Sequence, residues 1–180
     1  MTIWRCYISH QRCPSSLNFP TSIPGGSEGQ EITLVGFGRS GFGSYGYTSN
    51  TTFTDRRVGW NVIDGLESDD EGGGLDEIFI YDFDAPDSGD SPGNDLESMI
   101  APGDSGGPAL VPVDGGHSLV GINTFREGLG GQFGNTGGGV LVEPYLPWIR
   151  ETTGLYQVPE PSGMMMVVGA AVLMFVRRRS

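Results

Sequence analysis

Apolar and polar residues alternate over several short stretches of the chain, a pattern typical of half-buried β-strands. The alternation is clearest at residues 77–83, where the order is Glu, Ile, Phe, Ile, Tyr, Asp, Phe. Residues 108–112 and 118–125 are predicted to pair as neighbouring strands joined by a Gly-containing turn at residues 113–117. Further strands are expected at residues 31–38, 58–62 and 138–142. One short helix is expected at residues 145–153. The predicted fold class is therefore all-β, a barrel or a sandwich, with a short C-terminal helix.

The remaining stretches are rich in residues that form turns. Residues 1–30 show weak periodicity and are expected to be an irregular N-terminal segment, and residues 39–76 are expected to be loops apart from the strand at 58–62. The 180 residues fit one main domain, and the 31 glycines, 12 prolines and only 18% charged residues favour short strands over helices.

The charge balance excludes one class of partner. The net charge is −12, and all ten basic residues are arginines. Phosphate binding needs clustered cations, so nucleic acid is not an expected partner.

The two cysteines and two histidines give no metal site. Cys6 and Cys13 are the only cysteines, and they either close a small disulfide loop or remain free thiols. His10 and His117 have no cluster of ligands around them, so no transition-metal site is expected.

The C-terminus combines a short apolar stretch with a basic end. Residues 163–176 would span about 21 Å as a helix, against about 30 Å of hydrocarbon, so the stretch suits a temporary membrane stop. It follows Val158-Pro159-Glu160-Pro161 and precedes three arginines. Residues 156–180 thus resemble the PEP-CTERM sorting signal of bacterial exported proteins. The resemblance implies transient anchoring in the inner membrane through a short transmembrane helix, recognition by an exosortase-type enzyme, and a destination at the cell surface or outside the cell. Residues 1–10 lack the apolar core of a secretion signal.

The segment Gly103-Asp104-Ser105-Gly106-Gly107-Pro108 carries the strongest chemical signal. Glycines on both sides of Ser105 allow a tight turn that leaves its hydroxyl uncrowded. They also let a carbonyl group approach the amides of Gly103 and Ser105, as an oxyanion hole requires. This pattern predicts a nucleophilic serine.

Residues 31–155 resemble the C-terminal barrel of chymotrypsin-like serine proteases, because five landmarks occur in the family's order. They are Val35-Gly36-Phe37-Gly38, the loop 103–108, Gly121-Ile122-Asn123-Thr124-Phe125, Gly139-Val140-Leu141-Val142 and Tyr145-Leu146-Pro147-Trp148-Ile149. The resemblance implies a trypsin-like second barrel and a serine endopeptidase that acts on polypeptides through an acyl-enzyme.

The same resemblance implies roles for individual residues. Ser105 would be the nucleophile, Gly103 an oxyanion donor, and Asp104 the carboxylate that orders the loop. In the family this carboxylate pairs with a new N-terminus, so Asp104 needs another donor if the loop is to form. The residues implied in substrate binding are Met99, Thr124, Phe125, Arg126 and Gly139. Met99 at the pocket base favours an apolar side chain at the cleavage site, and Arg126 would obstruct the pocket mouth.

The sequence shows no clear candidate for the base that would activate Ser105. The family places its His and Asp upstream, where this chain has only His10, in a context that does not match, and no Asp before Asp55. His117 follows the nucleophile and is expected in a turn. Loss of a triad partner costs roughly 10⁴ in kcat. We therefore expect a truncated or remnant protease, inactive as it stands. The alternative hypothesis is a non-catalytic, surface-sorted binding or matrix protein.

Two stretches are dense in carboxylates. Residues 67–71 and 82–90 hold oxygen ligands of the kind that calcium prefers, but the EF-hand spacing is absent. Calcium binding and a solvated acidic loop both remain open, and no other cofactor is expected.

Overall fold

The computed structural model of the chain describes residues 26–51, 54–69, 74–89, 91, 97–114 and 116–154. They fall into two units that divide after Tyr145, and we describe each by itself. The first unit is built from strands and confirms the predicted all-β class. Its elements are β1 (Glu31–Gly36), β2 (Ser40–Phe42), β3 (Gly46–Ser49), β4 (Arg57–Val62), β5 (Gly65–Glu67), β6 (Ile78–Phe83), β7 (Pro108–Val113), β8 (Gly116–Glu127), β9 (Asn135–Leu141) and a 3₁₀ turn (Glu143–Tyr145).

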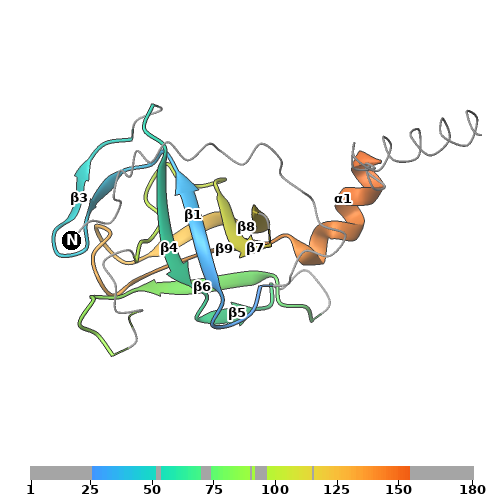
Figure 1. Cartoon of the computed structure of the whole chain (residues 1–180), viewed down its shortest axis with the longest axis horizontal. Helices are drawn as coiled ribbons and strands as arrows, with labels where there is room; N and C mark the ends of the chain where they lie inside the picture. Colours follow the sequence, from blue (N-terminus) through green and yellow to red (C-terminus); the bar gives the residue numbers. More distant parts are fainter. Residues whose placement is uncertain are drawn as a thin grey trace, which may run out of the picture. The chain divides into compact units, whose positions relative to one another are not determined.

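Seven strands form one antiparallel sheet in the order β4-β1-β7-β8-β9-β6-β5. The sheet curls into a half-barrel (Figure 1). Its two edge strands, β4 and β5, are consecutive in the chain and are separated only by Ile63 and Asp64. One bent segment therefore pairs with β1 on one side and with β6 on the other.

The core fills the inside of this curl. In β6, Phe79, Tyr81 and Phe83 point inward and are at most 1% exposed, which is the alternation predicted from the sequence. Strands β1, β7 and β8 also contribute buried apolar side chains to the inside of the curl. Burial of these side chains stabilises the curled form of the sheet. Among the described residues, the remaining fully buried apolar side chains are Ile32, Leu34, Ile63, Met99, Ala109, Val111 and Val120.

The side chain of Asn61 holds the two ends of the sheet together. Its amide group donates to the carbonyl oxygen of Asp82, next to the end of β6, at 2.7 Å and to that of Ser98 at 2.9 Å. Asn61 is 4% exposed, so these bonds form away from water and satisfy two backbone acceptors.

The prediction for residues 39–76 was partly wrong. This stretch contains the two-stranded sheet β2–β3 and the edge strand β5 besides β4. β2 and β3 are three and four residues long and contain glycines, so they carry little hydrophobic pattern. They are supported from far along the chain, because Tyr47 N donates to Gly130 O at 2.9 Å and Phe133 N to Gly43 O at 3.0 Å.

Other boundaries also differ from the prediction. His117 belongs to β8 and pairs with Pro112, whereas a turn was expected. The strand expected at residues 31–38 ends at Gly36. The second unit contains helix α1 (Leu146–Thr153), which begins one residue later than expected.

Several predictions fall on residues outside the described part of the chain. They concern Cys6, Cys13, His10, the sorting signal at residues 156–180 and the apolar stretch 163–176. Among the helices that the structure does describe, none has the length and apolar character needed to cross a membrane.

Candidate active site

Ser105 lies at the exposed tip of a tight loop between the buried segment 97–101 and β7. The turn is closed by two backbone bonds, Asp104 N to Ala101 O at 3.0 Å and Gly107 N to Asp104 O at 2.9 Å. Gly103 and Gly106 have φ values of 100° and 84°, in the left-handed region that side chains rarely adopt. The glycines on both sides of Ser105 are therefore required by the backbone, as the sequence predicted.

Backbone bonds on both sides fix the loop to the barrel. Gly106 N donates to Asn123 O at 2.8 Å, and Asn123 N donates to Gly107 O at 2.9 Å, which ties the loop to β8. On the other side, Arg39 N donates to Pro102 O at 3.0 Å. Ser105 is thus held between the middle of β8 and the start of β2.

The Asp104 carboxylate finds the donors that it needs within the chain. Its Oδ1 accepts a hydrogen bond from Gly38 N at 2.6 Å, and its Oδ2 accepts one from Ala101 N at 2.9 Å. A Cβ at Gly36 or Gly38 would collide with this carboxylate, which explains the two glycines at the end of β1. Asp104 is only 3% exposed, and the amides of Gly38 and Ala101 supply a hydrogen bond to each carboxylate oxygen. A newly formed N-terminus is therefore not required as a partner.

The protonation of Asp104 reflects two opposing effects. Burial raises the pKa of the carboxyl above its usual value, and the amides of Ala101 and Gly38 and the charge of Arg57 partly offset this increase. Arg57 is itself buried and donates from its guanidinium to Gly38 O at 2.6 Å. Arg57 and Gly38 thus form one network with Asp104 beneath the loop.

The amides of Gly103 and Ser105 differ from those of their neighbours. Within the described residues neither donates a hydrogen bond, although the amides of Asp104, Gly106 and Gly107 all do. Backbone amides beside an exposed hydroxyl are the kind of donor that an oxyanion hole uses.

The predicted substrate-binding residues are divided between the surface and the core. Thr124 is exposed, and Phe125 and Arg126 are half-buried, all three on β8 just beyond Asn123. Met99 is completely buried in the core, and a Cβ at Gly139 would collide with the carbonyl oxygen of Ile122. The structure therefore brings only the β8 residues to the surface near the loop.

Of the two histidines, only His117 belongs to the described residues, and it does not lie beside Ser105. His117 pairs with Pro112, four residues along β7 from Pro108, which corresponds to about 13 Å of strand. His10 lies outside the described residues. In the described part of the chain, no histidine is positioned to take the proton of Ser105.

Four residues of this site were not predicted from the sequence: Arg39, Tyr47, Arg57 and Asn123. Arg39 directly follows the Gly-Phe-Gly segment, and Asn123 lies within a segment already considered, so these two had a positional signal. Arg57 and Tyr47 had none, because their positions depend on hydrogen bonds to other segments, from Arg57 to Gly38 O and from Tyr47 N to Gly130 O.

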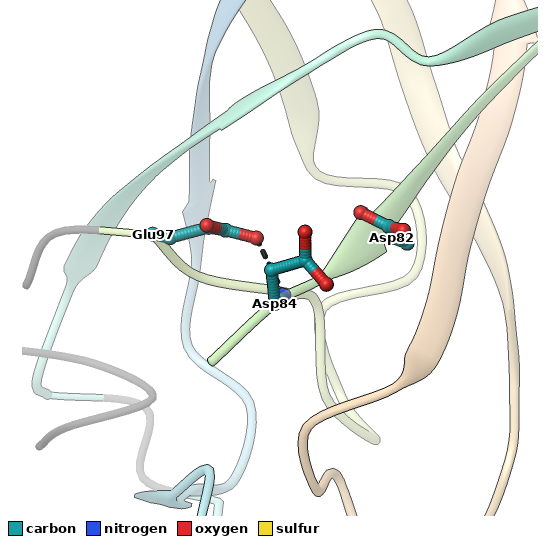
Figure 2. A group of neighbouring side chains, drawn as sticks. All are labelled: Asp82, Asp84 and Glu97. Atoms are coloured by element: carbon teal, nitrogen blue, oxygen red, sulfur yellow. Dashed lines mark hydrogen bonds between the residues drawn. The ribbon is translucent and has the colours of Figure 1, made fainter. Parts of the chain in front are cut away.

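A separate acidic cluster lies at the end of β6. One carboxylate oxygen from each of Asp82, Asp84 and Glu97 lies within 4.8 Å of the others (Figure 2). Burial raises the pKa of the Glu97 carboxyl; hydrogen bonds from Asp84 N and the Ser91 hydroxyl lower it, and the charges of Asp84 and Asp82 raise it. These three side chains could hold a metal ion through oxygen ligands. The predicted acidic stretch supplied two of them, whereas Glu97 was missed.

Comparison with known proteins found no family model and no curated protein that matches the sequence.

Proposed function

We propose that this chain is an exported serine endopeptidase of the chymotrypsin-like class. The curled sheet would be the C-terminal barrel of such an enzyme, with Ser105 as nucleophile and the amides of Gly103 and Ser105 as oxyanion donors. Asp104 would order the loop through Gly38 and Ala101.

The nucleophile loop is the observation that carries this proposal. An exposed serine lies at the tip of the loop, and the amides of Gly103 and Ser105 donate no hydrogen bond within the described residues. The left-handed Gly103 and the buried Asp104 below it hold this arrangement. Preorganised donors of this kind stabilise the oxyanion of acyl transfer by about 3–4 kcal/mol each.

The edge of β8 supports a polypeptide as substrate. β7 pairs with β8 only from Gly116 to Ile122, so Phe125, Arg126 and Glu127 pair with β9 alone, and Thr124 lies at an irregularity in that pairing. Their other edge lies beyond the nucleophile loop and offers backbone groups to an extended peptide, which would add as a further strand.

The test is covalent labelling of Ser105. The histidine and aspartate that the resemblance requires are not among the described residues, so the probe is applied to the whole protein as the native host makes it. A fluorophosphonate should label Ser105 of that protein and should not label Ser105→Ala. Ser44→Ala, which changes an exposed serine in the β2–β3 turn, is the matched control and should retain the label. If the folded wild type is not labelled, the enzyme proposal is wrong.

A second function, a non-catalytic binding protein, is favoured by one observation. The described residues place no histidine beside Ser105, so the same barrel could bind a peptide along β8 without cleaving it. A folded chain that retains peptides but reacts with no fluorophosphonate would support this alternative.

We further propose that residues 156–180 direct the protein out of the cell. The apolar stretch 163–176 would hold the chain in the inner membrane until an exosortase-type enzyme removes the tail. Changing Pro159 and Glu160 together to Ala should retain the protein in the membrane fraction. An unchanged distribution between membrane and medium would contradict this role.

For the acidic cluster we propose calcium as the metal, because its three ligands are all carboxylate oxygens. Calcium should then raise the melting temperature of the wild type more than that of Asp84→Asn. Equal shifts in the two proteins would exclude the cluster as the binding site.

A further inference from the structure

Two arginines lie over one tyrosine beside the nucleophile loop. The guanidinium carbon of Arg39 is 4.9 Å from the centre of the Tyr47 ring, and that of Arg126 is 5.4 Å from it. Both distances are within the range of cation–π attraction, so two positive charges lie at the same ring. An anion that reaches both guanidinium groups would be attracted by each of them.

No carboxylate in the described residues neutralises this pair. Arg39 Nε donates to Ser49 O at 3.2 Å, and an Nη atom of Arg126 donates to Gly128 O at 2.9 Å. Each guanidinium has five N–H donors, so most of them remain for a ligand. A pair without an acidic partner is unexpected in a chain with 22 acidic residues and a net charge of −12.

The pair is positioned by the same bonds that fix the loop of Ser105. Arg39 N donates to Pro102 O, directly before Gly103, and Arg126 lies three residues beyond Asn123, which is bonded to Gly106 and Gly107. Arg126 is also on the part of β8 that β7 leaves free. A peptide that adds to this edge would therefore pass the two guanidinium groups as it approaches Ser105.

The ring of Tyr47 is held in a fixed position between Arg39 and Arg126 and its own packing neighbours. Its hydroxyl is buried and has no hydrogen-bond partner among the described residues, and a Cβ at Gly131 would lie 2.5 Å from its ring. Burial raises the pKa of this hydroxyl, against the lowering effects of Arg126 and Arg39, so the ring remains neutral. The arginines thus lie over a rigid, uncharged surface.

We propose that Arg39 and Arg126 together bind the carboxylate side chain of a Glu or Asp residue in the peptide, next to the bond presented to Ser105. This inference rests on the proposed function and names its substrate class. It replaces the expected apolar preference, because Met99 is inside the core and two cations lie at the edge where the peptide would bind.

Binding to the full-length Ser105→Ala protein tests this proposal without requiring catalysis. The probes are two acetylated and amidated hexapeptides of Ala and Gly that contain one Glu or one Gln, titrated by NMR. The Glu peptide should bind about tenfold tighter than the Gln peptide, a difference of about 1.4 kcal/mol, because its carboxylate accepts charge-assisted hydrogen bonds. The difference should shrink as salt is added.

Variants assign the effect to the two arginines. Arg126→Gln and Arg39→Gln should each weaken the Glu peptide to the level of the Gln peptide and leave the Gln peptide unchanged. Arg56→Gln removes the same charge from an exposed side chain before β4 and should keep the tenfold difference. Circular dichroism checks that each variant is folded.

The possible outcomes separate the two proposals. Equal binding of the Glu and Gln peptides overturns the acidic preference. The preference is also overturned if a Gln peptide made without the C-terminal amide binds as tightly as the Glu peptide, because the arginines would then bind a C-terminal carboxylate and not a side chain. Fluorophosphonate labelling of wild-type Ser105 is measured independently, so its failure counts against the enzyme and not against the arginine pair. A protein that binds neither peptide contradicts both.

Discussion

At the scale of single residues, the buried carboxylate of Asp104 connects the end of β1 to the loop of Ser105. It accepts bonds from Gly38 N and Ala101 N and lies near the charge of Arg57. In Asp104→Asn, one of the two backbone amides would face the side-chain NH₂ group, which cannot accept its hydrogen bond. We expect it to lower the free energy of unfolding by about 1–3 kcal/mol. Urea denaturation measures this, with Asp114→Asn, an exposed residue, as the control that should change it by less than about 0.5 kcal/mol. Equal effects would show that the two amide bonds contribute nothing.

The glycines on both sides of Ser105 differ in the space around them, and this difference is testable. Gly103 and Gly106 both have positive φ, but a Cβ at Gly103 would lie 2.6 Å from Thr51 Cγ2, whereas one at Gly106 would meet nothing within 4 Å. Gly106→Ala should cost about 1–2 kcal/mol of stability from backbone strain alone. Gly103→Ala should cost more and should also reduce fluorophosphonate labelling, because the Gly103 amide, the first of the two proposed oxyanion donors, must move. Equal losses of stability in the two variants would contradict the described loop geometry.

At the scale of secondary-structure elements, one side chain on β4 links the two ends of the curled sheet. Asn61→Ala would remove the amide group that donates to the carbonyl oxygens of Asp82 and Ser98. Loss of these two hydrogen bonds should lower the free energy of unfolding by about 1–3 kcal/mol, measured by urea denaturation. Asn50→Ala, in an exposed position after β3, is the matched control and should change it little. A small effect at Asn61 would mean that water replaces both bonds.

The elements that could be predicted from the sequence are those whose side chains alternate between core and surface. β6 is the clearest case, because Phe79, Tyr81 and Phe83 are buried and the residues between them are not. β2 and β3 were missed because backbone bonds to Gly130 and Phe133 support them, and such bonds have no sequence pattern. The candidate site divides in the same way. The Ser105 loop is local and was identified, whereas the pairing of Arg39 with Arg126 depends on Tyr47 from a distant strand.

At the scale of the whole molecule, the net charge of −12 and two buried carboxyls connect stability to pH. The carboxyls of Glu97 and Asp104 both have a raised pKa in the folded state, chiefly from burial. At these two groups the folded protein therefore binds more protons than the unfolded chain between the usual carboxyl pKa, about 4, and the raised values. Their contribution to the free energy of unfolding is fully present below this window and is lost as the pH rises through it. Repulsion among the excess negative charges adds to the same trend.

Glu97→Gln isolates one part of this pH dependence. The amide group cannot ionise and can donate to the carboxylates of Asp82 or Asp84, so it removes repulsion within the acidic cluster. The variant should be more stable than the wild type at neutral pH and should lose this advantage near pH 4, where Glu97 of the wild type is protonated. Urea denaturation at several pH values measures the difference, and the exposed Glu28→Gln is the matched control for the loss of one charge. A constant difference between Glu97→Gln and the wild type across the pH range would mean that Glu97 titrates alike in the folded and unfolded states, and that the cluster stores no electrostatic strain.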